Sequence, residues 1–157
     1  MASVSVGDKA PDFSLFDQTK TLRSLGEFAG KNVILAFYPG AFTGVCDKEL
    51  CTFRDSLDAL NAANAQVVGV SIDLPFTARV FAERYELSFP LLSDYNRSVI
   101  RQYGLICPNF AGLPDLDSTM RAVILLDGGG IIRYLEVTAN PGVEPDYTAL
   151  LNAAAAL

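Results

Sequence analysis

Residues 33–60 read VILAFYPGAFTGVCDKELCTFRDSLDAL, and this stretch decides the fold. Its first six residues, Val33–Tyr38, form an unbroken apolar run that is rich in residues favouring β-structure. Such a run is typical of a central strand that is buried on both faces. The Pro39-Gly40 pair that follows predicts a turn directly after the strand.

Beyond the turn the pattern becomes helical. Apolar residues recur at steps of three and four residues, at Leu50, Phe53, Leu57 and Leu60. This period predicts one helix from about Thr43 or Gly44 to about Asn64. The segment therefore runs from a buried strand through a tight turn into a helix.

The rest of the chain continues the alternation of strands and helices. Further strands are expected at 66–72, 90–93, 121–126 and 131–136, and further helices after Pro75, at 96–103 and at 145–157. The Asp127–Gly130 turn joins the last two strands as an antiparallel hairpin. A strand–helix–strand order implies parallel neighbours with a right-handed crossover. The expected fold is α/β and thioredoxin-like, with a mixed central β-sheet flanked by helices.

Composition limits the function. The length of 157 residues favours a single domain over 1–157, and a net charge of −6 makes nucleic acid and anionic membranes poor partners. The chain has no histidine, which excludes Cys-His and Ser-His-Asp catalysis and histidine-based metal sites. Three cysteines are too few for a disulfide scaffold or a four-thiolate zinc site. The first ten residues lack signal-peptide features and no apolar run could span a membrane, so a cytoplasmic location is expected.

Cys46 stands where a thiol can be reactive. It falls in the first turn of the predicted helix, where unpaired backbone N–H groups and the positive end of the helix dipole favour the thiolate. The alternative is that Cys46 is a small buried hydrophobic residue, as most free cysteines are. Its place at a strand–loop–helix junction favours the reactive interpretation.

The pattern Pro39-x-x-x-Thr43-x-x-Cys46 resembles the active-site signature of the peroxiredoxins. Flanking segments extend the resemblance along most of the chain, at 7–13, 89–94, 121–126 and 130–133. Ala41-Phe42-Thr43-Gly44 is similar to the alkyl hydroperoxide reductase E type. The Cys46-x4-Cys51 spacing is instead similar to the Q or bacterioferritin-comigratory type.

The resemblance implies a role for each matched residue. Cys46 would be the peroxidatic cysteine, and Thr43 would hold the peroxide through a hydroxyl that can donate and accept. Arg121 would stabilise the thiolate and the charge of the reacting oxygens. Pro39 would cover the site and exclude water. Glu49 has two readings, either as a residue that orients Arg121 or as an ordinary exposed helix residue.

Two further cysteines are candidates for the resolving cysteine, the residue that forms a disulfide with oxidised Cys46. Cys51 lies five residues after Cys46, which in an intact helix is a rise of roughly 7.5 Å and a separation beyond disulfide reach, so a bond requires the first helical turns to unwind. The resemblance makes Cys51 the resolving candidate, with a buried structural thiol as the alternative. Cys107 lies in an apolar segment, is expected more often in the core, and is the less favoured resolving candidate.

The resemblance implies a thiol-dependent peroxidase that reduces hydrogen peroxide and small organic hydroperoxides without metal, haem or flavin. Thioredoxin or a similar thiol would recycle the enzyme through a disulfide. A homodimer is expected to pair across the surface around Pro39–Thr43 and Pro75–Phe81. The alternatives are a thioredoxin-fold disulfide oxidoreductase, for which a Cys-x-x-Cys motif is lacking, and a redox-sensing or holdase protein.

Overall fold

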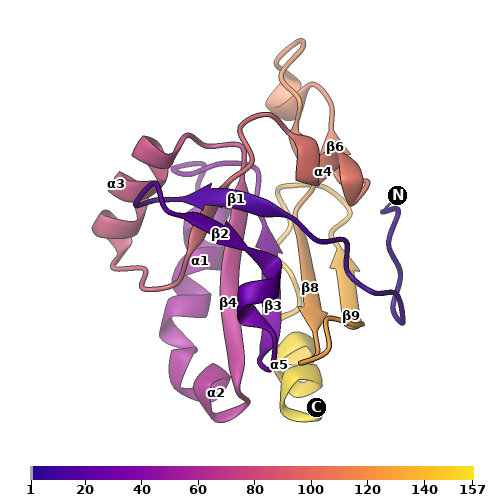
Figure 1. The fold of residues 1–157 in the computed structure, drawn as a ribbon. Coiled ribbons are helices and arrows are strands. Elements are labelled where there is room, and N and C mark those ends of the chain that lie inside the picture. The colour runs from indigo at the N-terminus through magenta and orange to yellow at the C-terminus, as the bar shows by residue number, and fades with distance from the viewer. Residues whose placement is uncertain (1) are drawn as a thin grey trace.

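The computed structural model describes residues 2–157, in which a seven-stranded mixed sheet is flanked by helices (Figure 1). Its strands are β1 (Ser14–Asp17), β2 (Leu22–Ser24), β3 (Asn32–Phe37), β4 (Ala65–Ser71), β5 (Leu91–Ser93), β8 (Ala122–Leu126) and β9 (Ile132–Val137). The helices are α1 (Val45–Asp55), α2 (Leu57–Ala62), α3 (Pro75–Tyr85), α4 (Ser98–Gln102) and α5 (Tyr147–Ala155). Two 3₁₀ turns, η1 (Leu25–Phe28) and η2 (Phe110–Gly112), and a two-stranded ribbon of β6 (Ile106–Cys107) and β7 (Ser118–Thr119) complete the described elements.

The strand order is β2-β1-β5-β4-β3-β8-β9. Strands β3, β4 and β5 are parallel, whereas β8 and β9 are antiparallel to their neighbours (Figure 1). The helices between the parallel strands act as crossovers, and the Asp127–Gly130 turn closes the predicted hairpin of β8 and β9. The predicted α/β, thioredoxin-like architecture is therefore confirmed.

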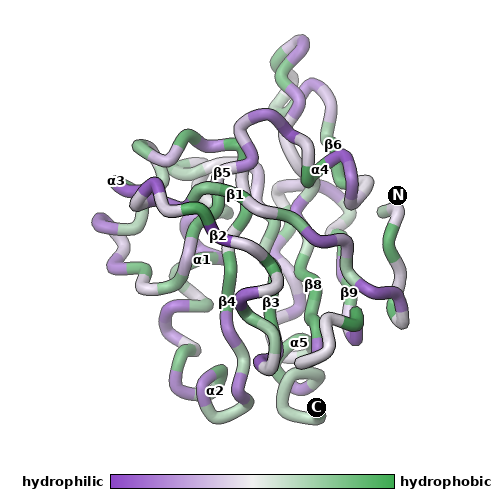
Figure 2. The backbone as a smooth tube through the Cα atoms, viewed as in Figure 1, coloured by the Kyte–Doolittle hydropathy of each residue, from purple (hydrophilic) through white to green (hydrophobic). Residues whose placement is uncertain are grey.

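Two apolar layers hold the sheet, and β3 contributes to both. Val33, Leu35 and Phe37 face a layer that contains α4 and the N-terminal segment. Ile34, Ala36 and Tyr38 face the layer beneath α1, α2, α3 and α5. Figure 2 shows the resulting hydrophobic colouring along β3, β4 and β8. The unbroken apolar run in the sequence thus reflects a strand covered on both sides.

The predicted helix from residue 43 or 44 to 64 is two helices, which corrects the expectation. Ser56 separates α1 from α2 and adopts φ −101° and ψ 8°, outside the helical range. Its backbone N–H donates to the carbonyl of Phe53, and its hydroxyl donates to that of Thr52. A serine that competes with the helical ladder in this way bends or ends a helix without disturbing the apolar period.

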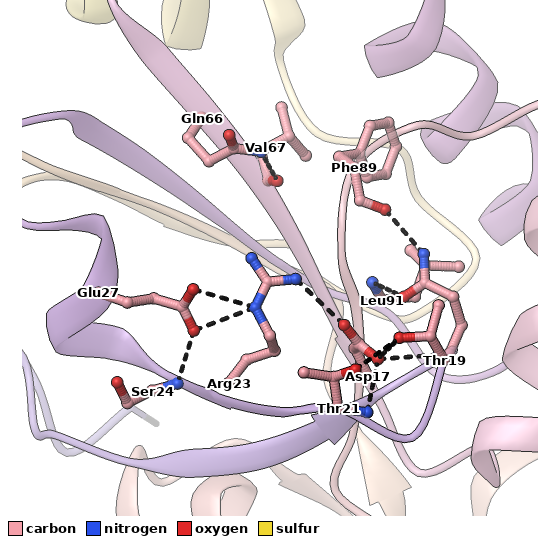
Figure 3. A network of polar contacts seen from close by, with 11 residues as sticks. Asp17, Thr19, Thr21, Arg23, Ser24, Glu27, Gln66, Val67, Phe89 and Leu91 are labelled. Carbon is pink, nitrogen blue, oxygen red and sulfur yellow. Dashed lines mark hydrogen bonds and ion pairs between the residues drawn. The ribbon is translucent and has the colours of Figure 1, made fainter.

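Strands β1 and β2, which lie at one side of the sheet with β2 at its edge, were not predicted from the sequence. They are four and three residues long, and a polar network rather than a long apolar face holds them (Figure 3). The Asp17 carboxylate accepts from Thr19, Thr21 and Arg23. Arg23 also contacts both carboxylate oxygens of Glu27 through Nε, at 3.0 Å each. Short strands of this kind carry too few residues for a periodic signal.

The later helices are shorter than the sequence analysis placed them. The segment predicted at 96–103 forms α4 over Ser98–Gln102, and the one predicted at 145–157 forms α5 over Tyr147–Ala155, where Asp146 accepts a hydrogen bond from Ala149 N–H. Within residues 2–157, no helix is long and apolar enough to cross a membrane.

Candidate active site

Cys46 lies where β3 passes into α1. The chain leaves β3 at Phe37, turns through residues 38–44 and enters α1 at Val45, so Cys46 is the second helical residue. Gly44 adopts φ +80°, a left-handed conformation that glycine tolerates best, and this lets the loop enter the helix sharply. The Cys46 side chain is fully buried. The thiol therefore belongs to the first turn of α1, at the positive end of the helix dipole.

Arg121 reaches Cys46 from the neighbouring strand. Phe37 pairs with Ala122 across β3 and β8, so the residue before β8 stands beside the end of β3. The Arg121 Nη2 atom donates to Cys46 Sγ at 3.1 Å, and the Nε atom donates to the Pro141 carbonyl at 2.9 Å. The Arg121 side chain is 2% exposed. A buried guanidinium in contact with sulfur can stabilise a thiolate and the negative charge that a reacting oxygen gains.

Glu49 is the third member of the buried cluster. Its Oε1 atom accepts from Arg121 Nη1 at 3.2 Å, and the side chain is 0% exposed. Burial, opposed by the charge and hydrogen bond of Arg121, raises the pKa of Glu49 to about 8. The structure therefore places Glu49 against Arg121 rather than in solvent. Its second oxygen, Oε2, has no hydrogen-bond partner within residues 2–157.

The loop of residues 39–44 carries the other two predicted site residues. The Thr43 hydroxyl donates to the Gly40 carbonyl at 2.7 Å, which leaves its oxygen lone pairs free to accept. Pro39 is buried, and its carbonyl accepts from the Ser118 hydroxyl at 2.8 Å. Thr43 and Arg121 both line one pocket, which Pro39 does not line.

This pocket has a volume of about 310 Å³. It is lined by Thr43, Val45, Cys107, Asn109, Phe110, Ala111, Arg121, Pro141 and Gly142. Most of this lining is apolar. Arg121, which contacts the buried sulfur of Cys46, lines the pocket, whereas Cys46 itself does not. A second pocket of about 370 Å³ lies near Val33 and Leu126, at the opposite end of β3 and β8, and has no contact with the cysteine.

The two remaining cysteines lie in different elements of the structure. Cys51 lies in α1 and is half-buried, and burial raises its pKa. Cys107 lies in β6, is half-buried and lines the pocket beside Thr43, so the expectation that it belongs to the core is wrong. Burial also raises the pKa of Cys107. All three thiols are unpaired within the described residues.

Asp73 is a site residue that the sequence analysis missed. Its carboxylate accepts from the backbone N–H of Ala41 and from the Ser71 hydroxyl, each at 2.8 Å. It thereby ties the loop of residues 39–44 to the end of β4. Its position in the sequence could have indicated this role. Asp73 follows the carboxyl end of β4, a parallel strand adjacent to β3, and functional loops meet at such strand ends in open α/β sheets.

No group of three or more metal-binding side chains occurs among residues 2–157. The side chains gathered at Cys46 are a thiol, a guanidinium, a carboxyl group and a hydroxyl. They can stabilise a sulfur anion and bind a small oxygen compound at one point.

Residues 6–135 match the AhpC/TSA family. Alkyl hydroperoxide reductase E of Mycobacterium bovis is 36% identical over 157 residues, which cover 98% of each protein. Chloroplastic peroxiredoxin Q of Populus jackii is 37% identical over 134 residues, 85% of this chain and 61% of that protein. The chain thus spans about three fifths of the length of the plant relatives it matches. The solved structure of peroxidoxin BcpB from Mycobacterium tuberculosis is 30% identical, with a TM-score of 0.85 and 97% of each chain covered.

Proposed function

The chain belongs to the AhpC/TSA family of peroxiredoxins, and from that premise we propose that it is a thiol-dependent peroxidase that reduces hydrogen peroxide and small organic hydroperoxides. One observation carries the proposal: Arg121 donates to the buried sulfur of Cys46 at a helix N-terminus, next to a pocket that Thr43 also lines. A redox-inert core cysteine has no need of a guanidinium in contact with its sulfur.

In the proposed reaction the Cys46 thiolate attacks one oxygen of the hydroperoxide. The sulfur–oxygen bond forms as the oxygen–oxygen bond breaks, and the leaving oxygen takes a proton and departs as water or an alcohol. Cys46 becomes a sulfenic acid. Arg121 stabilises the charge on the oxygens, Thr43 binds the peroxide, and Glu49 orients Arg121. Pro39 shields the sulfur from water.

A second thiol ends the cycle. It attacks the sulfenic sulfur, a disulfide forms, and the oxygen leaves as water. We take Cys51 as the resolving residue and an external dithiol such as thioredoxin as the source of the two electrons that reduce the disulfide. A reducing compartment such as the cytoplasm fits this cycle, because external thiols there keep cysteines reduced.

The proposal includes a single domain and a homodimer. The surface around Pro39–Thr43 and Pro75–Phe81 carries four exposed apolar side chains: Phe42, Leu74, Phe76 and Val80. Burial of these side chains against a second copy would remove them from water. Sedimentation of the reduced protein, with Phe76→Ser as the variant that weakens pairing, tests the dimer.

Peroxide consumption by the purified protein tests the proposed function. We expect Cys46→Ser to abolish consumption, while Cys51→Ser and Cys107→Ser each retain a first turnover, because only Cys46 contacts Arg121. A disulfide oxidoreductase, a redox sensor or a holdase would not consume peroxide rapidly. Oxidation at the parent rate in the Cys46 variant would overturn the assignment.

A further inference from the structure

Tyr85, the last residue of α3, is hydrogen-bonded to α1 at two points. Its hydroxyl donates to Asp47 Oδ2 at 2.6 Å, and its backbone carbonyl accepts from Arg54 Nη1 at 2.8 Å. Asp47 directly follows Cys46, and Arg54 belongs to the last turn of α1. One residue of a neighbouring helix thus holds both ends of the helix that carries Cys46 and Cys51.

Cys51 lies between these two contacts. Asp47, Cys51 and Arg54 are spaced by four and three residues, so they share one face of α1. Cys46 belongs to a different face, which is buried together with Glu49, Leu50 and Phe53. Burial also raises the pKa of Cys51, which lowers the fraction of nucleophilic thiolate while α1 is intact.

The proposed disulfide requires this arrangement to open. Five helical residues rise about 7.5 Å, and a disulfide needs Cα atoms within about 7 Å, so the turns between Cys46 and Cys51 must unwind. Asp47 lies inside that segment. Unwinding therefore moves Asp47 away from the Tyr85 hydroxyl or breaks their hydrogen bond.

Tyr85 is itself well anchored. Its ring packs edge-on against Phe81 of the same helix, with centroids 5.3 Å apart, and lies 6.4 Å from the ring of Phe42 in the active-site loop. The side chain is half-buried, and α3 packs against the sheet through Ala78, Phe81 and Ala82. The hydroxyl thus projects from a fixed support toward the segment that has to move.

On the basis of the proposed function, we infer that Tyr85 is a positioning residue that keeps α1 wound and so sets how readily Cys51 reaches the sulfenic acid of Cys46. While the Asp47 hydrogen bond holds, the Cys46 sulfenic acid persists and a second peroxide can oxidise it to sulfinic acid. When the bond opens, the Cys51 thiol attacks the Cys46 sulfur. The sulfur–sulfur bond then forms, the sulfur–oxygen bond breaks, and water leaves with the thiol proton.

The first test uses reduced Tyr85→Phe protein without peroxide, which keeps the ring and removes only the hydroxyl. We expect amide exchange across residues 45–55 and alkylation of Cys51 to become about 3- to 10-fold faster, the effect of losing one hydrogen bond at a half-exposed position. Tyr95→Phe is the matched control, because Tyr95 is 47% exposed and its hydroxyl has no hydrogen-bond partner within residues 2–157. Arg54→Gln removes the second contact and should also speed amide exchange across these residues. Alkylation is not the readout for this variant, because the charge of Arg54 lowers the pKa of Cys51.

The second test adds hydrogen peroxide in excess over protein, because sulfinic acid requires a second peroxide molecule, and maps the products. Tyr85→Phe should raise the ratio of Cys46–Cys51 disulfide to Cys46 sulfinic acid by a similar factor and leave the rate of Cys46 oxidation unchanged. Exchange at the parent rate would overturn the inference, and so would faster exchange with an unchanged product ratio. Failure of the parent protein to react with peroxide would instead contradict the proposed function, and the peroxide-free readouts separate the two failures.

Discussion

Arg121 Nη2 lies 3.1 Å from Cys46 Sγ, although 75 residues separate the two in the chain. The register between β3 and β8 creates this contact. Phe37 pairs with Ala122, so Arg121 lies beside the loop that follows Phe37. An isolated buried cation is costly, and a negative sulfur or carboxylate in contact offsets that cost. Arg121 has both groups within hydrogen-bond reach, Cys46 and Glu49.

We expect Arg121→Ala to slow oxidation of Cys46 by about 10²–10³-fold, the usual loss when one charge-stabilising donor is removed from an active site. Stopped-flow mixing with hydrogen peroxide measures this rate. Arg133→Ala is the control, because Arg133 is half exposed and pairs with Asp127 in the hairpin, away from the pocket. A rate within a few-fold of the parent would make Arg121 a purely structural residue.

The apolar pattern was sufficient to predict the central strands, because β3, β4 and β8 are covered on both faces and their sequences are almost wholly apolar. It could not predict that Ser56 interrupts the helix, since Leu57 and Leu60 keep the period across the break. The helix is interrupted because the Ser56 hydroxyl donates to the Thr52 carbonyl. The spacing of apolar residues carries no information about this hydrogen bond.

The candidate site was predictable only in part. Cys46 and Thr43 lie in one continuous segment, and Arg121 followed from the family resemblance. Burial of Glu49 was not decidable, because a glutamate on a helix is ordinarily exposed and only the tertiary position of Arg121 draws it inward. The places of Asp73 and Cys107 depend on how separate loops meet at the ends of the strands.

Glu49 should make stability depend on pH. Its ordinary pKa is 4.5 and its pKa in the folded protein is about 8, so the folded state keeps a proton that the unfolded state loses between these values. This contribution to the free energy of unfolding therefore falls as pH rises from about 4.5 to about 8. Glu49→Gln has no such proton and should flatten the dependence, whereas the exposed Glu83→Gln should not. Urea unfolding at both ends of this range measures it, and an unchanged slope in Glu49→Gln would contradict the prediction.

Asp73→Ala should slow peroxide reduction by loosening the active-site loop. The substitution leaves the Ala41 N–H and the Ser71 hydroxyl without their acceptor, and a lost hydrogen bond to a charged group costs about 1.5–3 kcal/mol. We expect about a tenfold or greater loss at low peroxide concentration, with Asp73→Asn retaining more activity because its amide oxygen still accepts. The exposed Asp58→Ala serves as control. Equal kinetics in the Ala and Asn variants would show that the acceptor at position 73 is not needed.

The resolving thiol gives the last prediction. Cys51 lies in α1 together with Cys46, and a disulfide between them requires α1 to unwind. Cys107 instead lines the same pocket as Thr43 and Arg121. We expect one equivalent of peroxide to yield a Cys46–Cys51 disulfide, because α1 begins at Gly44, which provides no side-chain cap, so its first turns can open from the N-terminus. Peptide mapping of the parent, Cys51→Ser and Cys107→Ser proteins distinguishes the candidates. The disulfide should survive in Cys107→Ser and be absent in Cys51→Ser. A Cys46–Cys107 disulfide in the parent protein would give the role to the pocket thiol, and a lasting sulfenic acid in all three proteins would make the enzyme a one-cysteine peroxidase.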